Sequence, residues 1–344
     1  GTATGCGISG TALTVNTPGT CTVTASVAAN GAYASATTNA TITFNAATRT
    51  ISLDDATTTA DQSVTLAATV SAGDGTVTYT AADGTATGCG ISGTALTVNT
   101  PGTCTVTASV AANGAYASAT TNATITFNAA TRTISLDDAT TTADQSVTLA
   151  ATVSAGDGTV TYTAADGTAT GCGISGTALT VNTPGTCTVT ASVAANGAYA
   201  SATTNATITF NAATRTISLD DATTTADQSV TLAATVSAGD GTVTYTAADG
   251  TATGCGISGT ALTVNTPGTC TVTASVAANG AYASATTNAT ITFNAATRTI
   301  SLDDATTTAD QSVTLAATVS AGDGTVTYTA ADGTATGCGI SCTA

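Results

Sequence analysis

The clearest structural signal in the chain is SVTLAATVSAGDGTVTYTA, residues 63–81. On either side of Asp74-Gly75, apolar side chains alternate with Thr, Ser or Ala at a period of two residues. This alternation is typical of β-strands with one buried face. An Asp-Gly pair between two such runs favours a tight hairpin turn. The stretch therefore predicts two antiparallel strands joined by a hairpin.

The same alternation marks further strands around this hairpin. The predicted strands are residues 50–53, 63–72, 76–81, 95–99, 103–112 and 123–127, with a short one at 90–92. The turn residues Asn-Thr-Pro-Gly at 99–102 separate two of them, and no window has a helical period. About seven strands in two antiparallel sheets around a thin core suit an immunoglobulin-like β-sandwich. We therefore expect an all-β fold.

The whole chain is a tandem repeat. The stretch GTATGCG begins at Gly1, Gly84, Gly167, Gly250 and Gly333, so the period is 83 residues. The copies differ at one position, where the last copy has Cys342 and the other four have Gly. A fixed period of this length indicates an array of one domain, and near-identity indicates recent duplication or homogenisation. We expect identical domains arranged as beads on a string or as a fibre.

The domain boundaries follow from the weakest hydrophobic stretch. Residues 128–131, Asn-Ala-Ala-Thr, separate Phe127 from Ile134, and we place the linker there. The complete domains are then predicted at 49–131, 132–214 and 215–297. Residues 1–48 correspond to the C-terminal part of such a domain, and residues 298–344 correspond to its N-terminal part. We expect both to belong to one continuous polymer of domains.

Composition excludes several classes of function. The net charge is −16, with 20 acidic residues, four Lys or Arg residues and no His. A chain this acidic is not expected to bind nucleic acid or an anionic membrane. It lacks the histidine of a Ser-His-Asp triad, and no apolar run is long enough to span a membrane. We therefore predict no enzymatic activity, no cofactor and no membrane insertion in this segment.

Two cysteines recur in every repeat, 15 residues apart. The predicted disulfides are Cys6–Cys21, Cys89–Cys104, Cys172–Cys187 and Cys255–Cys270. Each would close a loop worth about 3 kcal/mol of stability in the chain-entropy model. The alternatives are buried free thiols or a zinc site, but structural zinc usually has four Cys or His ligands. Disulfides indicate an extracellular protein. Cys338 and Cys342 are expected to be unpaired, or to pair across a seam between copies.

Three aspartates of each repeat lie close to its first strand. Asp54, Asp55 and Asp61 are candidate Ca²⁺ ligands at the domain junction, because Ca²⁺ prefers carboxylate oxygens. The alternative is a solvated acidic turn. We favour the turn and assign no metal site, because the regularly spaced D-x-D-x-D-G pattern of a calcium loop is absent.

The C-terminal half of the repeat carries a family resemblance. Residues 89–119 read CGISGTALTVNTPGTCTVTASVAANGAYASA. The motifs C-x-I-S-G and G-T-C-T-V-T-A, with a Tyr before the last strand, resemble bacterial immunoglobulin-like repeats of large surface and adhesin-type proteins. The resemblance implies an extracellular stalk or adhesive array at the bacterial cell surface. It implies no particular ligand at the tip.

Two functions are therefore predicted. The first is a structural segment of a bacterial extracellular fibre or adhesin stalk, in which identical disulfide-stapled domains give length and stiffness. The alternative is a filament subunit that polymerises head-to-tail, with residues 298–344 completing residues 1–48 of the next chain by strand complementation. The expected partner in both is a further copy of the same repeat.

Overall fold

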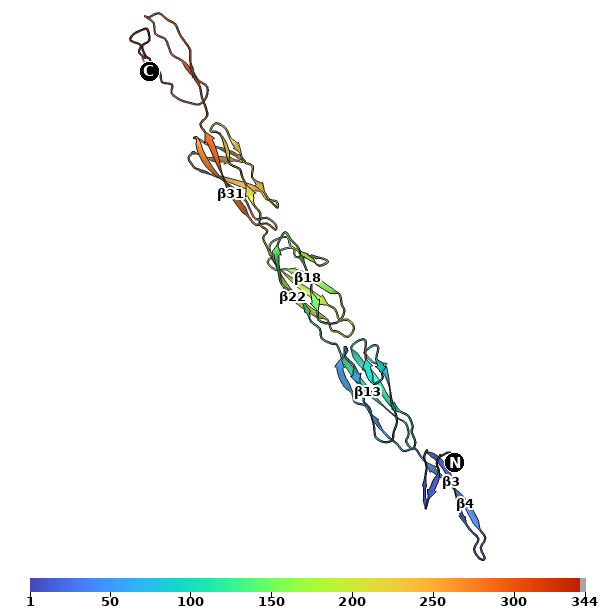
Figure 1. Ribbon diagram of the computed structural model, residues 1–344. Coiled ribbons are helices and arrows are strands. Elements are labelled where there is room, and N and C mark those ends of the chain that lie inside the picture. The colour runs from blue at the N-terminus through green and yellow to red at the C-terminus, as the bar shows by residue number, and fades with distance from the viewer. Residues whose placement is uncertain (341–344) are drawn as a thin grey trace. The chain divides into compact units, whose positions relative to one another are not determined.

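The computed structural model describes residues 1–340, and this part of the chain contains strands but no helix. Accordingly, residues 1–340 include no helix that could cross a membrane. The chain divides into a unit of residues 1–211 and a unit of residues 212–344. Figure 1 shows a strand-rich repeat around each of the labelled strands β13, β22 and β31.

In the first unit, the repeat of residues 49–131 contains nine strands. They are β5 (Ile51–Ser52), β6 (Ala56–Thr59), β7 (Val64–Thr65), β8 (Thr69–Val70), β9 (Val77–Asp83), β10 (Gly90–Ser92), β11 (Ala95–Thr97), β12 (Gly102–Val110) and β13 (Ala119–Asn128). The larger sheet has the order β6-β13-β12-β9, with β6 parallel to β13 and the other pairs antiparallel. On the opposite side of the core are two separate sheets, β10-β11-β7 and β5-β8. They are separate because one predicted strand is divided into β7 and β8.

This strand order is that of an immunoglobulin-like sandwich. The chain begins in β5, which pairs with β8, and then crosses to the larger sheet as β6. The central strands pair as β9-β12-β13 on one side and as β7-β11-β10 on the other. The predicted fold class, a tandem array of immunoglobulin-like β-sandwich domains with an 83-residue repeat, is confirmed.

The core lies between the two sheets. Alternate residues of β12 and β13 point inward and are almost completely buried, including Val106, Val110, Ile125 and Phe127 at 0 to 1% exposure. The residues between them are mostly threonines on the outer face. A period-two pattern of this kind buries one face of the hairpin and hydrates the other.

Two features differ from the predicted strands. The predicted strand 63–72 is interrupted between β7 and β8, where the Ala68 N–H donates to the Tyr79 hydroxyl at 2.8 Å instead of to a neighbouring strand. Strand β6 was not predicted, because Ala56-Thr57-Thr58-Thr59 has no large apolar residue that would mark a buried face.

The next repeat has the same strands in the same registers. They are β14 (Ile134–Ser135), β15 (Ala139–Thr142), β16 (Val147–Thr148), β17 (Thr152–Val153), β18 (Val160–Asp166), β19 (Gly173–Ser175), β20 (Ala178–Thr180), β21 (Gly185–Val193) and β22 (Ala202–Asn211). Residues 1–48 form two hairpins. Their strands are β1 (Gly7–Ser9), β2 (Ala12–Thr14), β3 (Gly19–Val27) and β4 (Ala36–Phe44).

The second unit contains one complete repeat, followed by a further strand pair. The complete repeat consists of β23 (Ile217–Ser218), β24 (Ala222–Thr225), β25 (Val230–Thr231), β26 (Thr235–Val236), β27 (Val243–Asp249), β28 (Gly256–Ser258), β29 (Ala261–Thr263), β30 (Gly268–Val276) and β31 (Ala285–Asn294). The pair is β32 (Ile300–Leu302) with β33 (Ala317–Val319).

Candidate functional site

Four disulfides staple the repeats. Their S–S distances are 2.00 Å for Cys6–Cys21, 2.04 Å for Cys89–Cys104, 2.06 Å for Cys172–Cys187 and 2.08 Å for Cys255–Cys270. In the repeat of residues 49–131, Cys104 is fully buried in β12 and Cys89 is half-buried just before β10. Asp83, at the end of β9, shapes the loop that leads to Cys89, because its carboxylate accepts the Cys89 N–H at 2.7 Å.

The junction between repeats contains almost no free chain. Asn128 ends β13, and its carbonyl accepts the Ala60 N–H of the same repeat at 2.8 Å. Two residues later, Ala130 is already part of the next repeat. Its N–H donates to the Ala198 carbonyl at 2.8 Å, and its carbonyl accepts the Ala200 N–H at 2.9 Å. Of the predicted linker 128–131, only Ala129 separates the residues that are bonded to the two repeats.

A buried arginine fixes the chain just after this point. Arg132 is 6% exposed and donates Nε to the Ala200 carbonyl at 2.8 Å and Nη1 to the Asp157 carbonyl at 3.1 Å. Its Nη2 donates to the Ala194 carbonyl. The planar guanidinium can serve three carbonyls at once, and these bonds compensate the burial of its charge. Arg49 and Arg215 have the same burial and equivalent partners.

Sequence reasoning missed this arginine. The available signal was that Arg is the only basic residue of the repeat and that it directly follows the weak hydrophobic stretch. Its three partners come from loops that lie 25, 62 and 68 residues further along the chain. Their meeting point depends on the complete fold.

Loops of the repeat that follows the junction are also packed. The ring of Tyr199 lies directly against Gly156, where an added Cβ would come within 2.4 Å of the ring. The neighbouring Ala198 packs against the core cluster of the preceding repeat, residues 49–131. The loop around Ala198 therefore bonds to Ala130 of the linker and also contacts the preceding repeat.

The candidate calcium ligands have structural partners. Asp55 accepts the backbone N–H of Thr124 at 2.7 Å, and Asp61 accepts the Thr59 hydroxyl at 2.6 Å. This hydroxyl lowers the pKa of Asp61 below its usual value. Asp54 is exposed. Within residues 1–340, no group of three or more His, Cys, Asp or Glu side chains could hold a metal ion.

The remaining cysteines do not form a site that the structure describes. The Cys338 thiol is free and exposed. Cys342, for which we predicted an unpaired or seam position, lies outside the described residues.

Residues 1–48 present an open sheet face. Strands β3 and β4 pair in the register of β12 and β13, yet Val27 is 61% exposed whereas the equivalent Val110 is 1% exposed. Ile42 is 42% exposed, against 1% for the equivalent Ile125. The exposed face contains a shallow hollow of about 280 Å³. Ala25, Ser26, Val27, Ala36, Thr37 and Thr38 line it.

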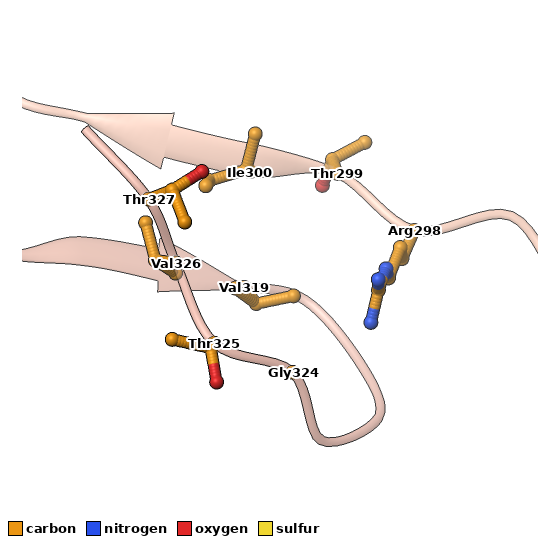
Figure 2. Close-up of a pocket in the computed structure, with 8 residues that line it drawn as sticks. All are labelled: Arg298, Thr299, Ile300, Val319, Gly324, Thr325, Val326 and Thr327. Atoms are coloured by element: carbon orange, nitrogen blue, oxygen red, sulfur yellow. The ribbon is translucent and has the colours of Figure 1, made fainter. Parts of the chain in front are cut away.

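A second open face lies in residues 298–340. It contains a hollow of about 300 Å³. Figure 2 shows Ile300, Val319 and Val326 among the residues that line this hollow, with Arg298 at one end. Ile300 is 60% exposed, whereas the equivalent Ile51 of the complete repeat is 7% exposed. Arg298 is exposed and donates Nη1 to the Asp323 carbonyl at 3.3 Å.

Comparisons with known proteins give fold-level similarity only. No family model matches the chain. No curated protein matches it. Among solved structures, it is similar to an I9–I11 tandem from titin, with 13% identity over 72% of this chain and 100% of that one, at a TM-score of 0.27. It is also similar to Drosophila N-cadherin EC1-4, with 12% identity over 80% and 83% of the two chains, at a TM-score of 0.25.

A third solved structure with similarity is the surface layer protein SbsC, domains 4–9. The identity is 16% over 69% of this chain and 44% of that one, and the TM-score is 0.22. The strand order described above defines the fold independently of these similarities. The chain is a tandem array of disulfide-bonded immunoglobulin-like domains, and this architecture fits a structural repeat segment.

Proposed function

We propose that this chain is a non-enzymatic structural segment of a bacterial extracellular fibre or adhesin stalk, in which each repeat adds length and the junctions add stiffness. The observation that carries the proposal is the closed junction. With Ala130 bonded into one repeat and Asn128 into the other, Ala129 is the only residue free to act as a hinge. A linker this short restricts independent tumbling of the two domains.

The path of the chain through each domain supports this function. Arg49 is bonded to carbonyls of residues 111 and 117, next to the end of β12 and the start of β13. The chain leaves the domain at Asn128, at the other end of β13. The chain therefore enters and leaves at opposite ends of the sandwich, and each repeat extends an array by the full length of a strand hairpin.

An extracellular location and a role in cell adhesion fit the chemistry of the chain. Four disulfides require an oxidising compartment to persist, as at a cell surface. The net charge of −16 opposes binding to nucleic acid. The partners that this function needs are further copies of the same repeat. Immunogold labelling of intact cells tests the location, and label confined to the cytoplasm would contradict it.

The stiffness is tested by opening one junction. Inserting Gly-Gly-Ser after Ala129 separates the two bonded residues without changing either domain. In negative-stain images, the angle between the two adjoining repeats should spread much more widely than in the unmodified chain. The same insertion after Gly176, in a turn where an added Cβ meets nothing within 4 Å, is the matched control. An unmodified junction that is already as variable as the opened one would contradict the proposal.

The second candidate function is a filament subunit that polymerises head-to-tail. In this candidate, residues 298–344 of one chain complete residues 1–48 of the next. The intact mass of native material under denaturing and reducing conditions separates the two candidates. A species near 32.4 kDa supports the subunit, and a far larger mass supports a segment of a giant chain.

A further inference from the structure

We infer that each complete repeat is a tension-bearing unit, held against a pull along the array by two parallel segments near its entry and exit. In the second complete repeat these segments are residues 130–142 and 199–211, here called the parallel pair, and Arg132 anchors the chain where it enters the pair. This inference rests on the proposed structural role, because a stalk or fibre has to carry tension as well as keep its length.

The entering chain follows the last strand of its own repeat in a single register. Ala130 forms a parallel bridge with Tyr199, and β15 pairs in parallel with β22. Directly before β15, the Asp138 carboxylate accepts the Thr207 N–H at 2.6 Å. The partners are 69 residues apart in all three cases. The same bonds are present between residues 47–59 and 116–128, and between residues 213–225 and 282–294.

A pull along the array loads the parallel pair in shear. The chain enters at Ala130 and leaves after Asn211, which lie at opposite ends of the two segments. Tension therefore slides residues 130–142 along residues 199–211 in the direction of the strands. The hydrogen bonds of the ladder run across the strands, so they have to lengthen together. In a hairpin pulled at its two open ends, the bonds would break one after another.

Arg132 connects the entering chain to three loops at the point where the pull arrives. Its guanidinium donates to the carbonyls of Ala200, Asp157 and Ala194. Ala200 belongs to the other segment of the pair, Asp157 lies between β17 and β18, and Ala194 directly follows β21. Because the side chain is only 6% exposed, these charge-assisted bonds lie in surroundings of low dielectric, where they are stronger than in water.

The disulfide of the repeat lies outside this path. Cys172 and Cys187 come after residue 142 and before residue 199, so the bridge belongs to neither segment of the pair. It adds stability, but it joins residues that are still folded when the pair separates. Stability and resistance to tension should therefore depend on different residues.

The test holds the full chain by its two ends at constant force and records how long each repeat stays folded. The three complete repeats have one sequence, so their unfolding steps should have equal lengths and one distribution of lifetimes. A change within residues 132–214 should alter one step in three, and the other two repeats are its internal control. Forced unfolding is governed by the unfolding rate, so a lost bond shortens the lifetime only if it is already broken at the transition state.

Variants of the parallel pair should shorten the lifetime. Arg132→Ala should do so by about 10- to 100-fold, because it removes three bonds from a charged group, and Arg132→Lys should not restore the lifetime. Asp138→Ala, a milder change on the surface, should shorten it by about 3- to 10-fold. Asp137→Ala is the matched control, because it removes the neighbouring exposed carboxylate and leaves the Thr207 bond in place.

Removing the disulfide should give the opposite combination. Replacing Cys172 and Cys187 by Ala should lower the melting temperature of that repeat, yet leave its lifetime under force equal to that of the other two. Its unfolding step should lengthen by about 5 nm, because a 15-residue span is no longer held closed and each residue extends by roughly 3.5 Å.

Two results would overturn the inference. One is an unchanged lifetime in Arg132→Ala, and the other is a lifetime that falls as much without the disulfide as without the arginine. If the Arg132→Ala repeat does not fold, Asp138→Ala and Asp137→Ala decide, and equal lifetimes for these two would overturn the inference.

The stiffness of the junction is tested separately. The Gly-Gly-Ser insertion after Ala129 leaves the parallel pair intact, so it should widen the angle between the repeats without changing their lifetimes. A failure of the tension test therefore leaves the proposed stiffness standing, and a failure of the stiffness test leaves the tension-bearing pair standing.

Discussion

The repeat of residues 49–131 and the segments 1–48 and 298–340 have the same sequence in two different surroundings. Strands β3 and β4 form in the same nine-pair register as the β12–β13 hairpin, although their inner face is open. The equivalents of β6 and β9 do not form strands in residues 298–340. Pairing within one hairpin is thus sufficient for β3 and β4. Strands β6 and β9 form where their pairing partners β13 and β12, which lie further along the chain, are present.

The largest expected difference between the two surroundings concerns the core phenylalanine. Phe127, Phe210 and Phe293 are 1% exposed, whereas the equivalent Phe44 is half-buried. Changing all three buried phenylalanines to Ala should lower the free energy of unfolding of each complete repeat by about 3–5 kcal/mol. Phe44→Ala should leave the urea midpoint of the complete repeats unchanged. Equal losses of stability from the two changes would mean that Phe44 is buried as deeply as the other three phenylalanines.

Removing the disulfides is expected to have the next largest effect. Each bridge closes a 15-residue span, so replacing Cys89 and Cys104 by Ala should destabilise that repeat by about 3 kcal/mol. Thermal unfolding followed by circular dichroism should show one repeat melting before the others. The double replacement of Cys6 and Cys21 is the comparison in the open segment, and it should leave the melting of the complete repeats unchanged.

Removing the arginine side chain should lower stability only where the guanidinium is bonded to its carbonyl partners. Arg132→Ala removes three hydrogen bonds that the buried guanidinium donates to carbonyls and should destabilise its repeat by about 2–3 kcal/mol in urea unfolding. Arg298→Ala is the control, because that guanidinium is exposed in the single chain. A loss of stability from Arg298→Ala in the monomer would contradict the difference between the two positions.

The acid response should be the same in both surroundings, because it is local. The Thr59 hydroxyl lowers the pKa of Asp61, and the Thr308 hydroxyl lowers the pKa of Asp310. A lowered folded-state pKa adds stability above the usual value of 3.8, and this stability is lost as the pH falls through the lowered pKa. Thr59→Ala and Thr308→Ala should each raise the carboxyl pKa toward 3.8 in an NMR titration. An unshifted titration in either variant would rule out the hydroxyl as the cause.

The sequence predicted the parts of the fold that depend on neighbouring residues. Alternating Val, Ile and Phe predicted the long strands, and the Asp-Gly pair predicted a turn between two of them. Strand β6 was not predicted, because its four small or polar residues form a strand only beside β13, about 70 residues away. The hydrogen bonds at the junction were not predicted for the same reason. The partner of Ala130 is the loop around Ala198, which meets it only in the folded repeat.

The closed junction is tested most directly by amide hydrogen exchange at Ala130, measured by NMR on the intact chain. Its N–H donates to the Ala198 carbonyl at 2.8 Å, so it should exchange as slowly as the strand amides beside it. The neighbouring Ala129 should exchange rapidly. An Ala130 amide that exchanges as fast as that of Ala129 would mean an open linker, and would contradict the proposed role of this chain as a stiff array.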